Sequence, residues 1–478
     1  MKKEKGLSVW SLTMMTLGTV IGGSFFLGSS VAIRAAGPSI ILAFIIAGAM
    51  VYFILFALSE MTVSNPTTGS FRTYASNAFG RGTGFVVGWV YWTGMVLAMS
   101  SEATAVSILI RQWLPGMSVA LMGAVIIIAV TLLNLLGAKA LSKLESGLAA
   151  IKLLAIVLFI VIAVLLIVGA FSSNAPVGFG ALTSEPLMPG GFASLAGSML
   201  IVMFTYAGFE IIGLAASEAE NPKDTIPKAI RNTVLSLVGL YIIAVAMLIV
   251  LIPTAGLNAD TSPFVAALDA RGFGWAGTAL NIVLITAILS TMLAAMFGLG
   301  RMMRSLVDEG MATDWLKDKK EVPYRGILFS GFGMLAALGI GLLFPSVYLF
   351  LISSGGFALL FTYLVIMATH IRFRKKYGCP PDGKCQLWGF PYTSAIVLLL
   401  IAIAIFSMPF VEGQASGLFA GGLFVVFYAA AYSIMKQLRS KKKRAAAASV
   451  GKLRTSLSAE ASRELTDTHK KGDDSQKT

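Results

Sequence analysis

Two stretches decide the fold: Gly18-Thr19-Val20-Ile21-Gly22-Gly23-Ser24-Phe25-Phe26 in the first apolar segment, and Phe204-Thr205-Tyr206-Ala207-Gly208-Phe209-Glu210 in a later one. Each places glycine and polar residues inside a run long enough to span a membrane. In lipid an unpaired backbone N–H or C=O costs several kcal/mol, so a broken helix persists only where it lines a cavity or is buried in protein. Paired breaks in corresponding positions of two halves indicate the midplane binding site of a secondary transporter.

The composition is that of a membrane protein. The chain has 478 residues, of which 56% are hydrophobic and 13% are charged, and its mean hydropathy is +0.82. Soluble domains carry about 25% charged residues. Apolar runs such as Val119–Leu136, Leu148–Phe171, Ile230–Ile252 and Thr393–Phe410 are near the ~20 residues that span the hydrocarbon core.

Charge distribution predicts the topology. Twelve spans are predicted, at residues 9–35, 39–63, 84–111, 118–137, 148–171, 191–217, 230–253, 274–303, 326–344, 346–369, 391–410 and 416–436. If the N-terminus is cytoplasmic, only Arg34, Arg111 and Arg271 of the 37 lysines and arginines face outward, as the positive-inside rule requires. The net charge of +14 therefore indicates a multi-pass plasma-membrane protein with both termini cytoplasmic and a basic surface near anionic lipid, and not a nucleic-acid-binding protein.

The same topology organises the chain into repeats. If each break lies in the first helix of a five-helix repeat, the second repeat is inverted, because an odd number of spans makes it start from the opposite side of the membrane. The predicted segments are a cytoplasmic N-terminus at 1–8, a transmembrane domain at 9–437 with repeats at 9–171 and 191–369 and two extra helices at 391–436, and a basic cytoplasmic tail at 438–478. The tail lacks the apolar content of a core and is predicted to be disordered, with a helix on the inner leaflet near Ala445–Leu465 as the alternative.

The chemistry of a helix break suits a zwitterion. One half-helix presents unpaired N–H groups and the other presents unpaired carbonyls. We expect the N–H groups of Gly23 and Ser24, with the Ser24 hydroxyl, to bind a carboxylate. We expect carbonyls near Val20 and from Phe204 to Ala207 to bind an ammonium group. The alternative is that these glycines only permit close helix packing.

Ionisable side chains inside a membrane span are costly and by default functional, and among those inside the predicted spans we single out Glu102, Glu210 and Lys152 as candidates for chemistry. Glu102 lies within the third span, and Glu210 follows the second break. Each could serve substrate or proton handling, or a structural hydrogen bond. Lys152 lies a few residues into the fifth span. A buried lysine can bind and release a proton during transport, whereas a lysine near a helix end can extend to the interface instead.

Other polar and aromatic residues have simpler interpretations. Three glutamates near inner helix ends are expected to act in a gate or to anchor loops: Glu60, Glu218 and Glu220. Trp89, Tyr91 and Trp92 are expected to pack or to lie at the interface rather than in the pocket. Cys379 and Cys385 are expected to be free thiols in a reducing cytoplasm, and with only two histidines we expect no metal site.

Several motifs together resemble those of bacterial amino acid permeases of the amino acid–polyamine–organocation superfamily. The resemblance covers the membrane domain, without the tail, and rests on Gly18–Gly28, Ser59-Glu60-Met61, Pro66–Phe71, Tyr74-Ala75, Gly88–Trp92 with Glu102, Phe204–Glu210, Ala216–Pro222 and Ile226–Ile230. It implies an all-α LeuT-type fold with alternating access and proton-coupled uptake of an amino acid. After the eighth span the family commonly reads Ser-Arg, whereas this chain has Gly300-Arg301. We therefore carry over no pocket residues from the family's eighth helix to this chain.

The resemblance also implies roles for individual residues. Gly22, Gly23 and Ser24 match the family's carboxylate-binding turn, and Lys152 matches a lysine that replaces a sodium ion in proton-coupled relatives. The positions whose carbonyls hold the amino group in the family are matched by Val20, Phe204 and Ala207. Phe204 also matches an aromatic residue that closes over the substrate. The predicted substrate-binding residues are Val20, Ile21, Gly22, Gly23, Ser24, Glu102, Phe204, Thr205, Ala207, Gly208 and Glu210; those predicted to couple protons are Lys152, Glu102 and Glu210.

The sequence therefore predicts a secondary active transporter that imports a neutral amino acid by proton symport, with no cofactor besides the coupling H+. An exchanger and a carrier of cationic amino acids or polyamines remain alternatives, and a receptor is the alternative from another class. The sequence holds no Gly-Lys-Ser/Thr nucleotide loop, which argues against an ATP-driven pump. It holds no nucleophile elbow either, which argues against an enzyme.

Overall fold

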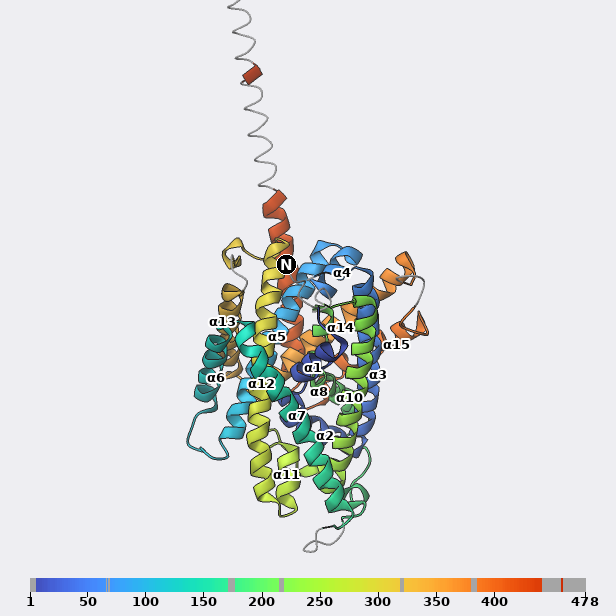
Figure 1. Ribbon diagram of the computed structural model, residues 1–478, viewed down its shortest axis with the longest axis vertical. Coiled ribbons are helices and arrows are strands. Elements are labelled where there is room, and N and C mark those ends of the chain that lie inside the picture. The colour runs from blue at the N-terminus through green and yellow to red at the C-terminus, as the bar shows by residue number, and fades with distance from the viewer. Residues whose placement is uncertain are drawn as a thin grey trace, which may run out of the picture. The chain divides into compact units, whose positions relative to one another are not determined.

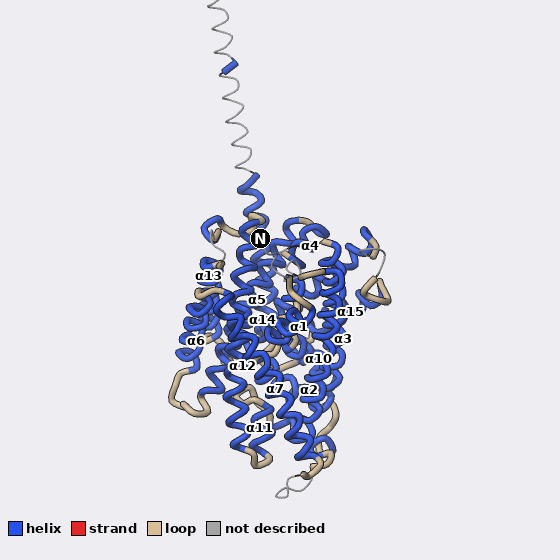
Figure 2. The backbone as a smooth tube through the Cα atoms, viewed as in Figure 1, coloured by secondary structure: helices blue, strands red, loops and turns tan. Residues whose placement is uncertain are grey.

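The chain is helical throughout the part that the structure describes. The computed structural model describes residues 6–65, 67, 69–170, 177–214, 219–318, 322–379, 385–440 and 457–458, without the side chains of 138–146, 211 and 214. Within these residues there is no β-strand, only an isolated bridge between Leu7 and Ala219 (Figures 1 and 2). The described chain is therefore all-α, as predicted.

The helices differ widely in length. The longer ones are α1 (Val9–Val20), α2 (Ser29–Ala36), α3 (Ile40–Ser64), α4 (Ser70–Phe79), α5 (Arg81–Ile110), α6 (Val119–Asn134), α7 (Ala138–Ile167), α8 (Gly191–Thr205), α10 (Pro222–Leu251), α11 (Pro263–Ala270), α12 (Gly274–Asp308), α13 (Tyr324–Gly341), α14 (Val347–Tyr377) and α15 (Tyr392–Phe406). Shorter pieces are the π-helix η1 (Ser24–Gly28), the α-helical turn α9 (Ile211–Leu214), and the 3₁₀ turns η2 (Gly37–Ser39), η3 (Gly180–Thr183), η5 (Thr254–Gly256), η6 (Asp314–Leu316) and η7 (Met408–Phe410).

Most of these helices are apolar enough to lie in a membrane. In the described residues, eight segments have the length and composition of a span: Ser24–Ser64, Arg81–Ile110, Gly147–Ile167, Pro222–Leu251, Gly274–Asp308, Tyr324–Gly341, Val347–Tyr377 and Ala415–Ser440. The apolar helices α1, α6, α8 and α15 are shorter. Two of these four, α1 and α8, end at the predicted breaks, so the interruptions of the first and sixth segments are confirmed. The count of twelve spans and the inverted repeat stay predictions.

Two helices, α5 and α14, form the centre of the bundle. In their most apolar stretches 83% and 78% of residues are buried, against 33% for Gly147–Ile167 of α7, so much of α7 lies exposed on the outside of the bundle. Small residues let α5 and α14 approach closely. A Cβ on Gly94 would lie 2.6 Å from the Ala358 Cβ, and one on Gly355 would lie 3.2 Å from the backbone nitrogen of Ala98. Such small-residue contacts are typical of helices that pack in membranes.

The buried carboxylate of Glu60, near the end of α3, anchors the chain that follows α14. It accepts hydrogen bonds from Arg374 Nε (2.7 Å) and Nη2 (2.8 Å) and from the backbone N–H groups of Gln386 (2.7 Å) and Leu387 (2.8 Å). His370 Nε2 lies 2.7 Å from the same carboxylate. Because a buried charge has to be paired and hydrogen-bonded, this cluster fixes the loop to α3, which agrees with the anchoring role expected for Glu60.

One expectation for this loop is wrong. Cys379 and Cys385 are joined in a disulfide, with their Cα atoms 4.9 Å apart, where free thiols were expected. The guanidinium of Arg374 holds both residues in place, since its Nη1 lies 3.0 Å from one sulfur and 2.9 Å from the other. Of the other glutamates expected at helix ends, Glu218 lies outside the described residues.

A second ionic contact ties α4 to the end of α12. Arg72 is fully buried, and its Nη1 donates to Glu309 Oε2 (2.7 Å) while Nη2 donates to Ser305 Oγ (2.7 Å). Burial acts to raise the pKa of Glu309, but the hydrogen bond and the positive charge of Arg72 outweigh it and hold this pKa below its ordinary value of 4.5. The Arg81 guanidinium donates to the Glu309 carbonyl (3.0 Å), so the contact also reaches the start of α5.

The chain divides into a compact unit of Met1–Val425 and a smaller one of Val426–Thr478. The helix Ala415–Ser440 continues across this division. The boundary expected at residue 437 stays a prediction, and the tail expected to be disordered lies outside the described residues except for 438–440 and 457–458.

Candidate substrate site

The first break separates α1 from η1. The helix ends at Val20, Ile21 adopts an extended backbone with ψ 102°, and the π-helix begins at Ser24. The N–H groups exposed by the break point at the carboxylate of Glu102 on α5. Gly23 N donates to Glu102 Oε2 at 2.6 Å, and Ser24 N donates to Oε1 at 3.2 Å. The break therefore presents an anion-binding pair of N–H groups where the sequence predicted it, and a side chain of the protein occupies it.

The carbonyls on the other side of this break meet Lys152 and Thr291. Lys152 is fully buried, so the alternative in which it extends to the interface is wrong. Its Nζ donates to the Gly18 carbonyl (2.7 Å) and to Thr291 Oγ1 (2.7 Å). The Thr291 hydroxyl lies 2.8 Å from the Ile21 carbonyl. A positive charge from α7 is thus placed at the carboxyl end of α1, where the helix dipole is negative, and it links three helices.

The second break follows α8 and touches the first. The chain turns from Tyr206 to Glu210, and Gly208 has a φ of +104°. A Cβ on Gly208 would lie 3.1 Å from the Thr19 carbonyl oxygen. Glycine is needed here twice, because the φ is unfavourable for other residues and because the backbones of the two breaks meet. The Phe204 carbonyl accepts the N–H of Ala207 at 3.0 Å, which closes the turn.

Glu210 holds the second break to the central helices. Its carboxylate is fully buried and accepts hydrogen bonds from the Tyr91 hydroxyl on α5 (3.0 Å), the Tyr363 hydroxyl on α14 (3.2 Å) and the backbone N–H of Gly208 (3.1 Å). This is the structural hydrogen-bonding role that the sequence left open for Glu210. A role in proton coupling stays a prediction.

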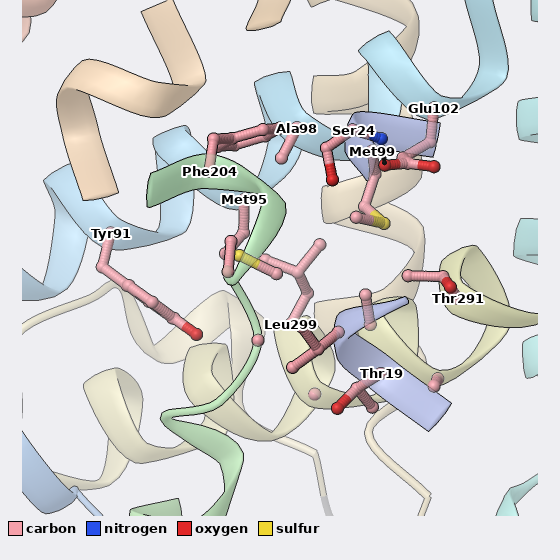
Figure 3. Close-up of a pocket in the computed structure, with 16 residues that line it drawn as sticks. Thr19, Ser24, Tyr91, Met95, Ala98, Met99, Glu102, Phe204, Thr291 and Leu299 are labelled. Carbon is pink, nitrogen blue, oxygen red and sulfur yellow. Dashed lines mark hydrogen bonds between the residues drawn. The ribbon is translucent and has the colours of Figure 1, made fainter. Parts of the chain in front are cut away.

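A cavity lies where the two breaks meet, and part of the predicted site lines it. Figure 3 shows residues from both breaks facing the same space, with the Glu102 carboxylate turned toward the backbone beside Ser24. Of the predicted residues, the lining includes Val20, Ser24, Glu102, Phe204, Ala207 and Gly208. It does not include Ile21, Gly22, Gly23, Thr205, Glu210 or Lys152, although Gly23 and Lys152 contact the lining residues Glu102 and Thr291.

The rest of the lining was missed, although spacing along the helices points to it. On α5 the missed residues lie three, four, seven and eleven positions before Glu102. On α12 they lie three, four, seven and eight positions after Thr291. Residues at these spacings share one face of a helix. The missed residues are Thr19, Tyr91, Met95, Ala98, Met99, Thr291, Ala294, Ala295, Gly298 and Leu299. Most of them are apolar or small. For Tyr91 the expectation of packing alone is wrong, since it lines the cavity, whereas Trp92 stacks on Phe329 and donates to Ser330.

Membrane-length apolar helices that enclose a cavity between two helix breaks define a multi-pass membrane transporter. Comparison with known families agrees, because the amino acid permease model matches residues 11–445. The chain therefore belongs to the amino acid permease family, which is a family of transporters and not of enzymes.

Curated relatives cover nearly the whole chain. It is 31% identical over 449 residues to the gamma-aminobutyric acid permease of Bacillus subtilis (strain 168), covering 93% of this chain and 96% of the relative. It is 34% identical over 423 residues to the aromatic amino acid transport protein AroP of Escherichia coli (strain K12), covering 86% and 91%. It is 31% identical over 444 residues to a putative histidine permease of B. subtilis (strain 168), covering 90% and 94%.

Proposed function

We propose that the protein imports a neutral amino acid across the plasma membrane by proton symport and alternating access. The proposal includes twelve spans in a LeuT-type pair of inverted five-helix repeats, with both termini cytoplasmic. The observation that carries it is the contact between the two breaks, where Gly208 meets the Thr19 carbonyl and a cavity forms beside them. A site made of N–H groups and carbonyls suits the carboxylate and ammonium groups that amino acids share.

The cavity wall supports a neutral side chain. Between α5 and α12 it is lined by Met95, Met99, Ala294, Ala295 and Leu299, which offer no hydrogen-bonding group to a charged side chain other than the weakly accepting methionine sulfurs. A buried charge without a partner is strongly unfavourable. Glu102 is the acidic residue of the lining, and its oxygens already accept two backbone N–H groups, so it is poorly placed to bind a cationic side chain as well.

The position of Lys152 supports coupling to protons. Its ammonium group donates to the Gly18 carbonyl and to Thr291, and so bridges α7, α1 and α12. A neutral amine has one donor fewer and no charge to interact with the end of α1. Loss of the proton would therefore weaken the link between α7 and the half-helix that ends at the break. This couples the protonation of one side chain to the position of the break during transport.

Uptake into proteoliposomes tests the proposal. A panel of radiolabelled amino acids is offered with and without an inward proton gradient, to wild type, to Lys152→Ala and to the control Lys375→Ala, whose side chain is exposed near the end of α14. We expect the gradient to stimulate accumulation of neutral amino acids in wild type and in the control, and not in Lys152→Ala. Accumulation only into preloaded vesicles would show exchange instead, and binding without flux would show a receptor.

A further inference from the structure

The carboxylate of Glu102 already occupies the N–H groups that are expected to bind the substrate. Gly23 N lies 2.6 Å from one of its oxygens and Ser24 N lies 3.2 Å from the other. Two N–H groups directed at the two oxygens of one carboxylate form the arrangement by which a helix start binds a free anion. Glu102 comes from α5, in a different part of the sequence, so it is not a local cap of the break.

The Glu102 carboxylate is packed closely against Gly22 and Gly23. A Cβ on Gly23 would lie 2.7 Å from Glu102 Oε2, and one on Gly22 would lie 3.2 Å from both oxygens. The side chains of Ile288 and Ala105 close the space beside Gly23, at 3.2 and 3.3 Å from that Cβ position. Two carboxylates in this buried place would also repel each other strongly.

We propose that Glu102 is an internal competitor of the substrate: its carboxylate holds the Gly23 and Ser24 N–H groups until the carboxylate of an incoming amino acid displaces it. The proposal rests on the proposed function and adds to it a residue that sets affinity. The displaced Glu102 side chain can turn into the cavity, because Glu102 lines it beside Met99 and Ala98 on the same helix. In this role it limits the affinity for substrate and does not supply a binding contact.

A different role for Glu102 makes the opposite prediction. If it stayed on the N–H groups and used its remaining lone pairs to accept the ammonium group, it would be a contact for the substrate's amine. Removing it would then weaken binding of every ligand that carries an amine. Removing a competitor would instead strengthen binding of every ligand that carries a carboxylate, whether or not an amine is present.

The experiment measures binding to the purified full-length protein by titration calorimetry at one pH. The probes are L-leucine, 4-methylpentanoate, which lacks the amine, and 3-methylbutylamine, which lacks the carboxylate. The variants are Glu102→Ala and the nearly isosteric Glu102→Gln, so that the second serves if the first fails to fold. The control is Ser101→Ala, the neighbouring buried position, whose hydroxyl donates to the Ala98 carbonyl within α5.

We expect Glu102→Ala to bind L-leucine and 4-methylpentanoate at least about tenfold more tightly than wild type, because charge-assisted hydrogen bonds compete for the same donors. Glu102→Gln should gain less, because its uncharged oxygen can still accept one bond, and Ser101→Ala should bind as wild type does. Unchanged or weaker binding of 4-methylpentanoate to both Glu102 variants overturns the proposal, and loss of 3-methylbutylamine binding assigns Glu102 to the amine.

Uptake by wild-type vesicles separates this proposal from the proposed function. If wild type accumulates a neutral amino acid and the Glu102 variants gain no affinity for carboxylates, the competitor role fails and the transport function stands. If the variants gain affinity for 4-methylpentanoate while no amino acid of the panel accumulates, the competitor role of Glu102 stands and the proposed transport function fails.

Discussion

Replacing Gly208 by alanine should separate the two breaks. The φ of Gly208 is +104°, and a side chain held in such a sparsely populated backbone conformation costs about 1–3 kcal/mol. The added Cβ would lie 3.1 Å from the Thr19 carbonyl oxygen and 3.3 Å from its carbon. These are backbone atoms that cannot rotate away, so the contact adds to the cost. We expect Gly208→Ala to lower the free energy of unfolding by at least about 1–3 kcal/mol and to weaken uptake.

Gly239→Ala is the matched control, since a Cβ there meets nothing within 4 Å and the residue lies inside α10. In a helix this change should stabilise by about 0.5–1 kcal/mol. The two variants should therefore shift the melting temperature in opposite directions when both are unfolded in the same detergent. A melting temperature of Gly208→Ala at or above that of wild type would refute the reasoning about the contact between the breaks.

Two further predictions concern the cavity and the contact between Arg72 and Glu309. Gly298 lies inside α12, lines the cavity and has no atom within 4 Å of an added Cβ. Like Gly239→Ala, Gly298→Ala should therefore raise the melting temperature slightly, but it should also lower kcat/KM for the bulkiest accepted substrate about tenfold or more relative to alanine. Gly339→Ala on α13, also in open space and away from the lining, should raise the melting temperature in the same way and leave the selectivity unchanged; an unchanged selectivity of Gly298→Ala would contradict the assignment. Because the pKa of Glu309 is lowered in the folded protein, wild type should be more stable than Glu309→Gln above pH 4.5 and should lose this advantage as the pH falls through the lowered folded-state value. The difference should be small because the side chain is 36% exposed, and a difference in melting temperature that does not change with pH would contradict it.

The sequence predicted the two breaks because they depend on local residues. Glycine and polar side chains inside an apolar run weaken a helix wherever it packs, and α1 and α8 end within the predicted stretches. It also predicted that the first break would present N–H groups at Gly23 and Ser24. These features follow from residues that are close together in the chain.

Features that depend on how distant helices align could not be predicted in this way. That Glu102 meets Gly23 depends on the depth and rotation of α5, which hydropathy does not fix to within one turn. The same holds for Lys152, because its burial depends on how α7 packs on α1 and α12. The apolar wall from Met95 to Met99 could have been found by helical spacing from Glu102, but an apolar residue in a span carries no signal that separates a pocket from lipid.

The hydrogen bonds made by Glu102 and Glu210 bear on the step in which a carrier reorients without bound substrate. A symporter has to make this return in every cycle, whereas an exchanger never does. Breaks with unpaired N–H groups would penalise the unloaded protein by about 1–3 kcal/mol for each buried donor. Here the donors at Gly23, Ser24 and Gly208 are satisfied by carboxylates of the protein itself. They need no amino acid to pair with, so the return of the empty carrier would carry no such penalty, as the proposed symport requires.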